Sequence, residues 1–128
     1  MITNEVRTST SLTRLDADGI VHMTILPGIH ETLADAQQTF RAGAVLRAGR
    51  RMPVLIDLRA GKSQDRDARH YYSSPEVTQG TRAAALLVAS RLSMVMARFF
   101  ITVAKPSIPT RIFTDEAEAL AWLKGFVE

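Results

Sequence analysis

The densest group of potentially reactive side chains lies in the segment 65–72, where Asp65, His70, Tyr71 and Tyr72 follow one another closely. Acid–base or nucleophilic catalysis needs such groups in direct contact. If this segment is helical, Asp65 and His70 are five residues apart and do not face each other. Ala68, Tyr71 and Tyr72 share one side of the same helix. We therefore expect the two tyrosines to line the core or a groove, with their hydroxyls at its edge.

Ser63 precedes this segment and has three basic residues close to it in sequence, Lys62, Arg66 and Arg69. An anion or a phosphate at Ser63 would meet free backbone N–H groups, the positive end of a helix dipole and these cations. Serine at a helix start is also a common N-cap, a role that needs no ligand. Ser63, Arg66 and Arg69 are therefore a candidate anion or phosphorylation site, with N-capping as the alternative.

Residue types exclude or disfavour several other kinds of site. The chain has no cysteine, so disulfides, thiolate metal ligands and cysteine nucleophiles are excluded. His22, His30 and His70 show no pair four residues apart, so we expect no metal and no cofactor. The run Ala-Gly-Lys-Ser at 60–63 lacks the first glycine of a phosphate-binding loop.

Composition favours a single globular domain of 128 residues, with 46% hydrophobic and 23% charged residues. The sequence shows neither a secretory signal nor an apolar run of the roughly 20 residues that span a bilayer, so we expect a cytoplasmic protein with no transmembrane segment. Residues 41–111 hold 13 basic and 4 acidic residues within a net charge of +3. This basic middle would attract phosphates or an anionic membrane surface, or pair with the acidic ends. Because no ladder of aromatic and basic residues accompanies it, we expect no nucleic acid partner.

Strand and helix patterns alternate along the chain. The segment 16–19, Asp-Ala-Asp-Gly, predicts the turn of an N-terminal β-hairpin. Thr32 begins the first helix as its N-cap, and Gly49 ends it. This alternation predicts the α/β class, with a single mixed, mainly parallel sheet, the N-terminal β-hairpin and four helices after a flexible tail at 1–6. We expect strands at 7–16, 20–26, 52–58, 83–89 and 110–113, and further helices at 63–74, 91–104 and 115–126.

The expected helix 91–104 is apolar on two sides. One stripe should pack on the sheet, and the opposite stripe is bordered by Arg91 and Arg98. A domain this small cannot bury both stripes, so we expect the outer one to meet a second copy of the chain. A lipid or another hydrophobic ligand, with its anionic head near the arginines, is the alternative. The inner stripe comprises Leu92, Val95, Met96, Phe99 and Val103, and the outer stripe comprises Met94, Ala97 and Ile101.

Three segments carry a family resemblance: DGIVHMTILPG at 18–28, PVLIDLR at 53–59 and KPSIPTRIFTDEAEALAWL at 105–123. In this order they resemble the SpoIIAA-like proteins of the STAS superfamily, which are small bacterial α/β domains. That superfamily includes anti-sigma-factor antagonists and cytosolic domains of sulphate transporters, and its fold is related to CRAL-TRIO lipid-transfer domains. The resemblance covers roughly residues 13–126 and includes no catalytic motif, so it implies a fold more than a function.

The phosphorylated antagonists resemble one another in an Asp-Ser-Ser-Gly run at the start of the helix after the third strand. Here Asp65 matches the aspartate, but Arg66 and Asp67 stand at the serine positions. This departure puts a phosphorylation switch of that type in doubt.

The resemblance and the missing catalytic motif predict a non-catalytic, STAS-like regulatory or protein-interaction module in the bacterial cytoplasm, and not an enzyme. Its partner would be a second copy of the chain or a regulatory protein. The alternative is a binder or carrier of a hydrophobic or anionic small molecule, such as a lipid.

Overall fold

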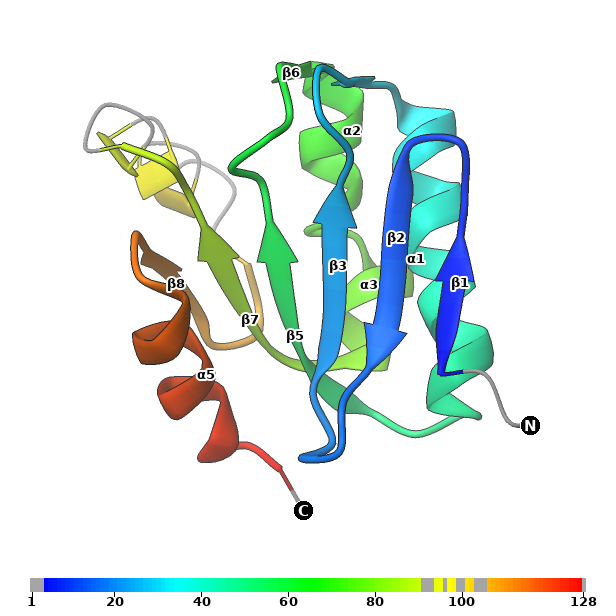
Figure 1. Ribbon diagram of the computed structural model, residues 1–128, viewed down its shortest axis with the longest axis vertical. Helices are drawn as coiled ribbons and strands as arrows, with labels where there is room; N and C mark the ends of the chain where they lie inside the picture. Colours follow the sequence, from blue (N-terminus) through cyan, green and yellow to red (C-terminus); the bar gives the residue numbers. More distant parts are fainter. Residues whose placement is uncertain (1–3, 91–93, 96, 99–100, 103–105, 128) are drawn as a thin grey trace.

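The computed structural model describes residues 4–90, 94–95, 97–98, 101–102 and 106–127, and shows one main sheet flanked by helices (Figure 1). The sheet has six strands in the order β1-β2-β3-β5-β7-β8. Antiparallel pairing joins β1, β2 and β3, whereas β3, β5, β7 and β8 are parallel. The expected mixed, mainly parallel sheet is confirmed. The strands are Glu5–Arg7 (β1), Ser11–Leu15 (β2), Val21–Ile25 (β3), Met52–Asp57 (β5), Thr81–Leu87 (β7) and Thr110–Phe113 (β8).

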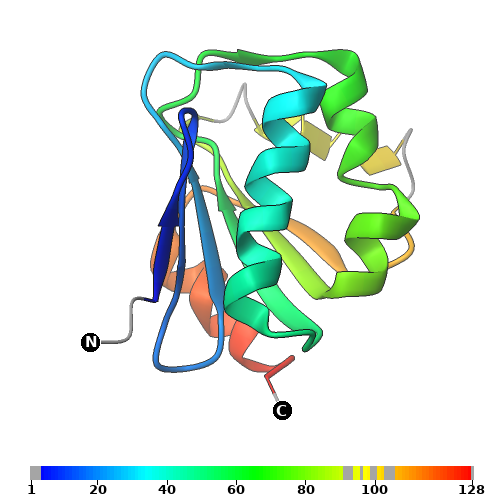
Figure 2. The same cartoon turned by 90° about the vertical axis from the view of Figure 1, so that its right-hand side faces the viewer.

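Helices cover both faces of this sheet. Figures 1 and 2 show α1, α2 and α3 on one face and α5 on the other. Met94, Val95, Ala97, Arg98, Ile101 and Thr102 are also helical, and we call them the 94–102 helix. None of the helices in the described ranges is both long and apolar enough to cross a bilayer. The helix bounds are Leu33–Arg47 (α1), Arg66–Tyr71 (α2), Pro75–Gly80 (α3) and Glu116–Lys124 (α5).

Two hydrophobic cores follow from the alternation of side chains along the central strands. Val54 and Ile56 of β5 belong to the core under α1–α3, while Leu55 belongs to the core under α5. Because β5 is buried on both faces, its sequence is a continuous apolar run without polar alternation.

The start of α1 agrees with the sequence in atomic detail. Thr32 accepts a hydrogen bond from the N–H of Asp35, and the Asp35 carboxylate accepts one from the N–H of Thr32. This capping box satisfies two backbone donors that the helix itself leaves free. At the other end Ala48 and Gly49 take positive φ angles of 51° and 79°, which ends the helix where the glycine predicted.

The N-terminal region differs from the expectation of a tail and one strand. Glu5 and Val6 were expected in the flexible tail, but they pair with β2 as part of β1; residues 1–3 lie outside the described ranges. The expected strand 7–16 is interrupted because the Thr8 hydroxyl accepts hydrogen bonds from the N–H groups of Thr10 and Ser11. Such a side-chain turn competes with strand pairing, so the hairpin becomes a three-stranded antiparallel unit.

The expected helix 63–74 is wrong at both ends. Ser63–Gln64 forms a short strand, β6, which pairs in parallel with β4, His30–Glu31. The helix α2 therefore begins only after Asp65, and Asp65 rather than Ser63 is its N-cap residue. A further helix, α3, starts at Pro75, where the fixed φ of proline suits the first helical position. In the last helix the N-cap is Asp115 rather than the expected Thr114.

Candidate ligand-binding site

A cavity of about 410 Å³ lies beyond the carboxyl ends of β3, β5 and β7. Open α/β sheets bind ligands in this position because the loops that leave the strands diverge there. The volume falls within the roughly 300–1,000 Å³ of typical small-molecule sites. The cavity is therefore the candidate functional site of the protein.

The walls of the cavity are apolar where the strands supply them and polar where the loops do. Ile25, Ile56 and Leu86 come from the three strands, and Leu58 and Val88 follow directly after β5 and β7. Ala97 of the 94–102 helix also lines the cavity. The polar lining comprises Glu31, Arg59, Lys62, Ser63, Gln64, Arg69 and Tyr72.

The three cations of the lining differ in how their charge is balanced. Arg59 contacts Asp57 at 2.8 Å and Glu116 at 3.2 Å. Burial works against ionisation of Asp57, but the hydrogen bonds and charge of Arg59 outweigh it and lower the pKa of that carboxyl. Lys62 and Arg69 have no carboxylate partner within the described ranges. The uncompensated positive charge of the cavity is thus carried by Lys62 and Arg69.

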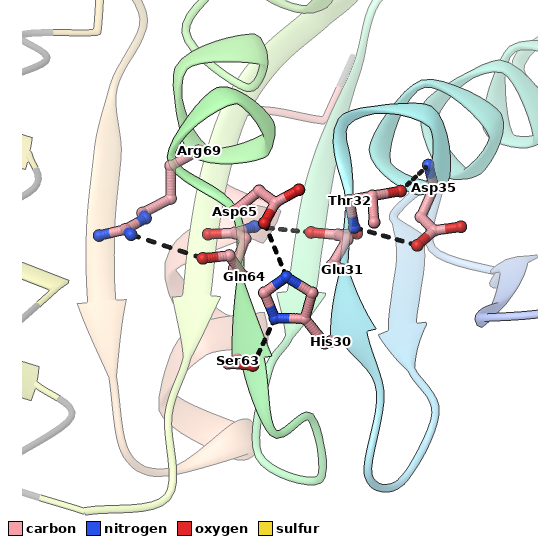
Figure 3. A network of polar contacts seen from close by, with 8 residues as sticks. All are labelled: His30, Glu31, Thr32, Asp35, Ser63, Gln64, Asp65 and Arg69. Atoms are coloured by element: carbon pink, nitrogen blue, oxygen red, sulfur yellow. Dashed lines mark hydrogen bonds and ion pairs between the residues drawn. The ribbon is translucent and has the colours of Figure 1, made fainter.

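The mouth of the cavity is closed on one side by the paired strands β4 and β6. His30 joins them through its side chain: Nδ1 lies 2.5 Å from the Ser63 hydroxyl and Nε2 lies 2.7 Å from Asp65 Oδ1 (Figure 3). Backbone bonds reinforce the contact, since the N–H of Asp65 donates to the carbonyl of Glu31 at 2.8 Å. We call His30, Ser63 and Asp65 the β4–β6 clasp.

The β4–β6 clasp contains the three groups of a Ser-His-Asp triad. In a hydrolytic triad the carboxylate is buried and holds the imidazole in place within the active site. Here the His30 and Asp65 side chains are 48% and 45% exposed. The contacts join β4 and β6, which are remote in sequence, and the exposure of the two side chains suits this structural role best.

Glu31 is a buried acid on the cavity wall, with a relative exposure of 1%. Its two oxygens accept hydrogen bonds from Gln64 Nε2 at 2.6 Å and from the Tyr72 hydroxyl at 2.8 Å. Burial raises the pKa of Glu31, against these two hydrogen bonds, which lower it. Burial and the neighbouring Glu31 also raise the pKa of Tyr72 well above its ordinary value, so the phenol stays a donor.

Tyr72 lies on a groove wall as expected, whereas Tyr71 lies in the core with its hydroxyl buried rather than at an edge. Tyr71 is buried beside Ala68 and packs edge-on against Phe40, with 6.3 Å between the ring centroids. Tyr72 lines the cavity and places its hydroxyl on Glu31 at the edge. Their role as wall and core follows from the helical spacing that the sequence predicted.

The candidate anion site is only partly assembled. Ser63 and Arg69 line the cavity together, but Arg66 is not among the lining residues. Arg66 directs Nε toward Nε2 of His70, at 3.5 Å, on the exposed side of α2. Asp65 contacts His30 and not His70, as their five-residue separation implied.

The described residues of the 94–102 helix that the sequence placed outside face the protein instead. Ile101, expected on the outside, packs against the core under α1–α3, and Ala97 lines the cavity. Met94 is also partly buried, while Val95, expected on the sheet, is 63% exposed. Both sides of the helix are apolar, so periodicity alone could not decide which side faces the sheet. Arg98 is exposed as expected; Arg91, Leu92, Met96, Phe99 and Val103 lie outside the described ranges.

Sequence reasoning missed three residues of the site, namely His30, Glu31 and Gln64. His30 and Glu31 leave β3 in a connection that carries no motif, and each contacts a residue more than 30 positions away. The one signal in the sequence was the adjacent pair His30 and Glu31 close to Pro27-Gly28, where a strand had to end. In the described ranges no group of three or more metal-ligating side chains comes together.

The family defined as Domain of unknown function (DUF7793) matches residues 13–127. The chain belongs to this family. No curated protein matches the sequence.

Two solved structures resemble this DUF7793 domain. One is an uncharacterized protein from the DUF3478 family of Shewanella loihica PV-4, described as having a SpoIIAA-like fold. It is 16% identical, with a TM-score of 0.62, over 95% of this chain and 92% of that chain. The other, a protein of unknown function from Arthrobacter sp. FB24, is 29% identical over 93% of this chain and 96% of that chain, with a TM-score of 0.35. The Shewanella structure confirms the expected SpoIIAA-like fold.

Proposed function

We propose that this DUF7793 protein is a non-catalytic binding module that holds a small hydrophobic or anionic molecule in its cavity. The observation that carries the proposal is the cavity of about 410 Å³ with apolar walls from β3, β5 and β7. Each methylene group moved from water into such a site contributes roughly 0.8 kcal/mol, so a short apolar ligand gains affinity from burial alone.

The non-catalytic part of the proposal is supported by the β4–β6 clasp. Ser63 is exposed, and the His30 and Asp65 side chains are about half exposed (48% and 45%), so water competes for each of their hydrogen bonds. Hydrolytic sites gain strength by excluding water from the reacting groups. We assign the clasp to holding β4 and β6 together at the mouth of the cavity.

A protein-interaction role, with the chain as a homodimer, is the second candidate. Val95 favours it, because Val95 and Val45 are the two large hydrophobic side chains that stand out as exposed in the described ranges, at 63% and 72%. A contact through the 94–102 helix would therefore use Val95 and Arg98 rather than the stripe that the sequence suggested.

The cavity can be tested with N-phenyl-1-naphthylamine, a neutral dye that fluoresces in apolar surroundings. We expect the protein to enhance its emission, and Ala97→Phe to weaken dye binding about tenfold by filling the cavity. Val95→Phe is the matched control, because it adds the same ring to the exposed side of the same helix. Equal binding by Ala97→Phe and the natural protein, with equal thermal stability, would contradict the proposal. Independently of the dye, native mass spectrometry of protein purified from its own host would identify a bound species.

A further inference from the structure

We infer that the molecule held in the cavity is an amphiphile with one oxyanion head, bound by Lys62 and Arg69, and an apolar chain directed toward Ile56 and Leu86. This inference rests on the proposed function, because it names the class of ligand for the same cavity. Charge, polar saturation and volume each support it.

Among the described residues, the unpaired positive charges of the cavity lining indicate where the head group of the ligand lies. Arg59 is already neutralised by Asp57 and Glu116, at 2.8 and 3.2 Å. Lys62 has no carboxylate partner in the described ranges, and Arg69 makes only a long hydrogen bond, from Nη2 to the carbonyl of Gln64 at 3.4 Å. Figure 3 shows the Arg69 side chain extending away from Asp65. An ammonium and a guanidinium without a counter-charge beside an apolar cavity are complementary to a carboxylate or a phosphate.

The hydrogen bonds around Glu31 disfavour a ligand whose anionic head lies beside this residue. Glu31 shares the cavity, and its oxygens are engaged by Gln64 and Tyr72 at 2.6 and 2.8 Å. An oxyanion beside Glu31 would find the Tyr72 hydroxyl and one N–H of Gln64 engaged, and a carboxyl group next to it. Gln64 separates the two sides, since its side chain donates to Glu31 while its backbone carbonyl accepts from Arg69. The head therefore belongs on the side of Lys62 and Arg69.

Volume and wall chemistry limit the rest of the ligand. If each non-hydrogen atom occupies about the 30 Å³ of a liquid water molecule, 410 Å³ holds on the order of a dozen atoms. The hydrocarbon side chains of Ile25, Ile56, Leu86 and Val88 offer no hydrogen-bonding group to a second polar end. A straight chain of about ten carbons with a single acidic end has this size and this polarity.

Three ligands with the same ten-carbon chain distinguish the contribution of the anionic head from that of the apolar chain. They are decanoate, decyl phosphate and the neutral decan-1-ol. Binding is measured by displacement of N-phenyl-1-naphthylamine and by calorimetry, at low and high salt. We expect at least one anion to bind about tenfold more tightly than decan-1-ol at low salt, with less advantage at high salt. A preference between decanoate and decyl phosphate shows which of the two head groups, carboxylate or phosphate, the cavity favours.

Matched variants locate the head group. Arg69→Gln and Lys62→Gln should each remove most of the advantage of the anion while leaving the affinity for decan-1-ol unchanged. Arg66→Gln is the control, since Arg66 lies on the same helix as Arg69 but does not line the cavity. Equal binding of the anions and the alcohol would overturn the inference and leave the proposed function standing. Failure of all three ligands, the neutral alcohol included, would overturn both.

Discussion

His30 and Asp65 lie 35 positions apart in sequence, and a 2.7 Å contact between Nε2 and Oδ1 joins them. This contact ties the connection after β3 to the connection after β5, at the mouth of the cavity. Because both side chains are about half exposed, the contact adds little to global stability but orders the two short strands.

Removal of the imidazole should therefore act locally. We expect His30→Ala to lower the free energy of unfolding by no more than about 1 kcal/mol. Amide hydrogen exchange at Asp65, whose N–H donates to the carbonyl of Glu31, should become several-fold faster. His70→Ala is the control, because His70 is exposed and does not contact Asp65. A large loss of global stability in His30→Ala would show that the clasp is part of the core structure instead.

Glu31 should make stability depend on pH. Folding raises the pKa of Glu31 because burial favours the protonated acid, so between the unfolded and folded pKa values the folded protein binds more protons than the unfolded chain. The stability contributed by Glu31 is therefore full below the ordinary pKa of a glutamate, 4.5, and declines as the pH rises toward the folded value. Glu31→Gln cannot titrate, and it should gain stability relative to the natural protein across this window. Urea unfolding at several pH values measures the difference.

Truncation of Glu31 to alanine should lower stability, whereas Glu31→Gln should raise it. Glu31→Ala leaves the Tyr72 hydroxyl and the Gln64 amide without their acceptor, at a cost of roughly 1–3 kcal/mol for each group that stays buried. If Glu31→Ala proved as stable as Glu31→Gln, water would be replacing the carboxylate, and Glu31 would have no structural role.

Ser63 should be unreactive if the protein is non-catalytic. We expect no labelling by a fluorophosphonate, which modifies serines that a neighbouring base activates. Ser63→Ala should keep its affinity for N-phenyl-1-naphthylamine within about twofold, since Ser63 supplies only one polar group to the cavity lining. Covalent modification at Ser63, abolished by His30→Ala, would instead identify the clasp as a working triad.

The two sides of the 94–102 helix should respond differently to a charge. Ile101 packs against the core under α1–α3, so Ile101→Glu should destabilise the fold by about 2 kcal/mol or more. Val95 is 63% exposed, so Val95→Glu should leave stability unchanged but convert a dimer to a monomer in light scattering. Val45→Glu, on α1, is the control for oligomeric state. A natural protein that is already monomeric would remove the support for the homodimer.

Much of the fold could be predicted because local signals and tertiary structure agree. The apolar runs of β5 and β7 have the composition of strands buried on both faces, and both are interior strands of the sheet. Thr32 and Asp35 form the expected start of α1 from residues three positions apart. Each of these signals is complete within a few residues, so neighbouring elements did not alter it.

The site was harder to predict because its contacts connect distant segments. His30 showed no partner at helical spacing, and its partners Ser63 and Asp65 lie 33 and 35 positions away. Pairing with β4 also drew Ser63 and Gln64 into a strand, which the helical pattern of the following residues concealed. For the 94–102 helix, two apolar stripes left the inward side undetermined until Ile101 was placed against the core.

Gly61 gives the cavity lining a further consequence. A Cβ atom at this position would lie 3.2 Å from Cγ2 of Ile25, a tight contact that Ile25 would relieve by moving a few tenths of an ångström. A residue larger than glycine at 61 would therefore press on Ile25, and both positions line the cavity. We therefore expect relatives that carry a side chain here to accept shorter molecules, so that this single backbone position would divide the family by the length of cargo.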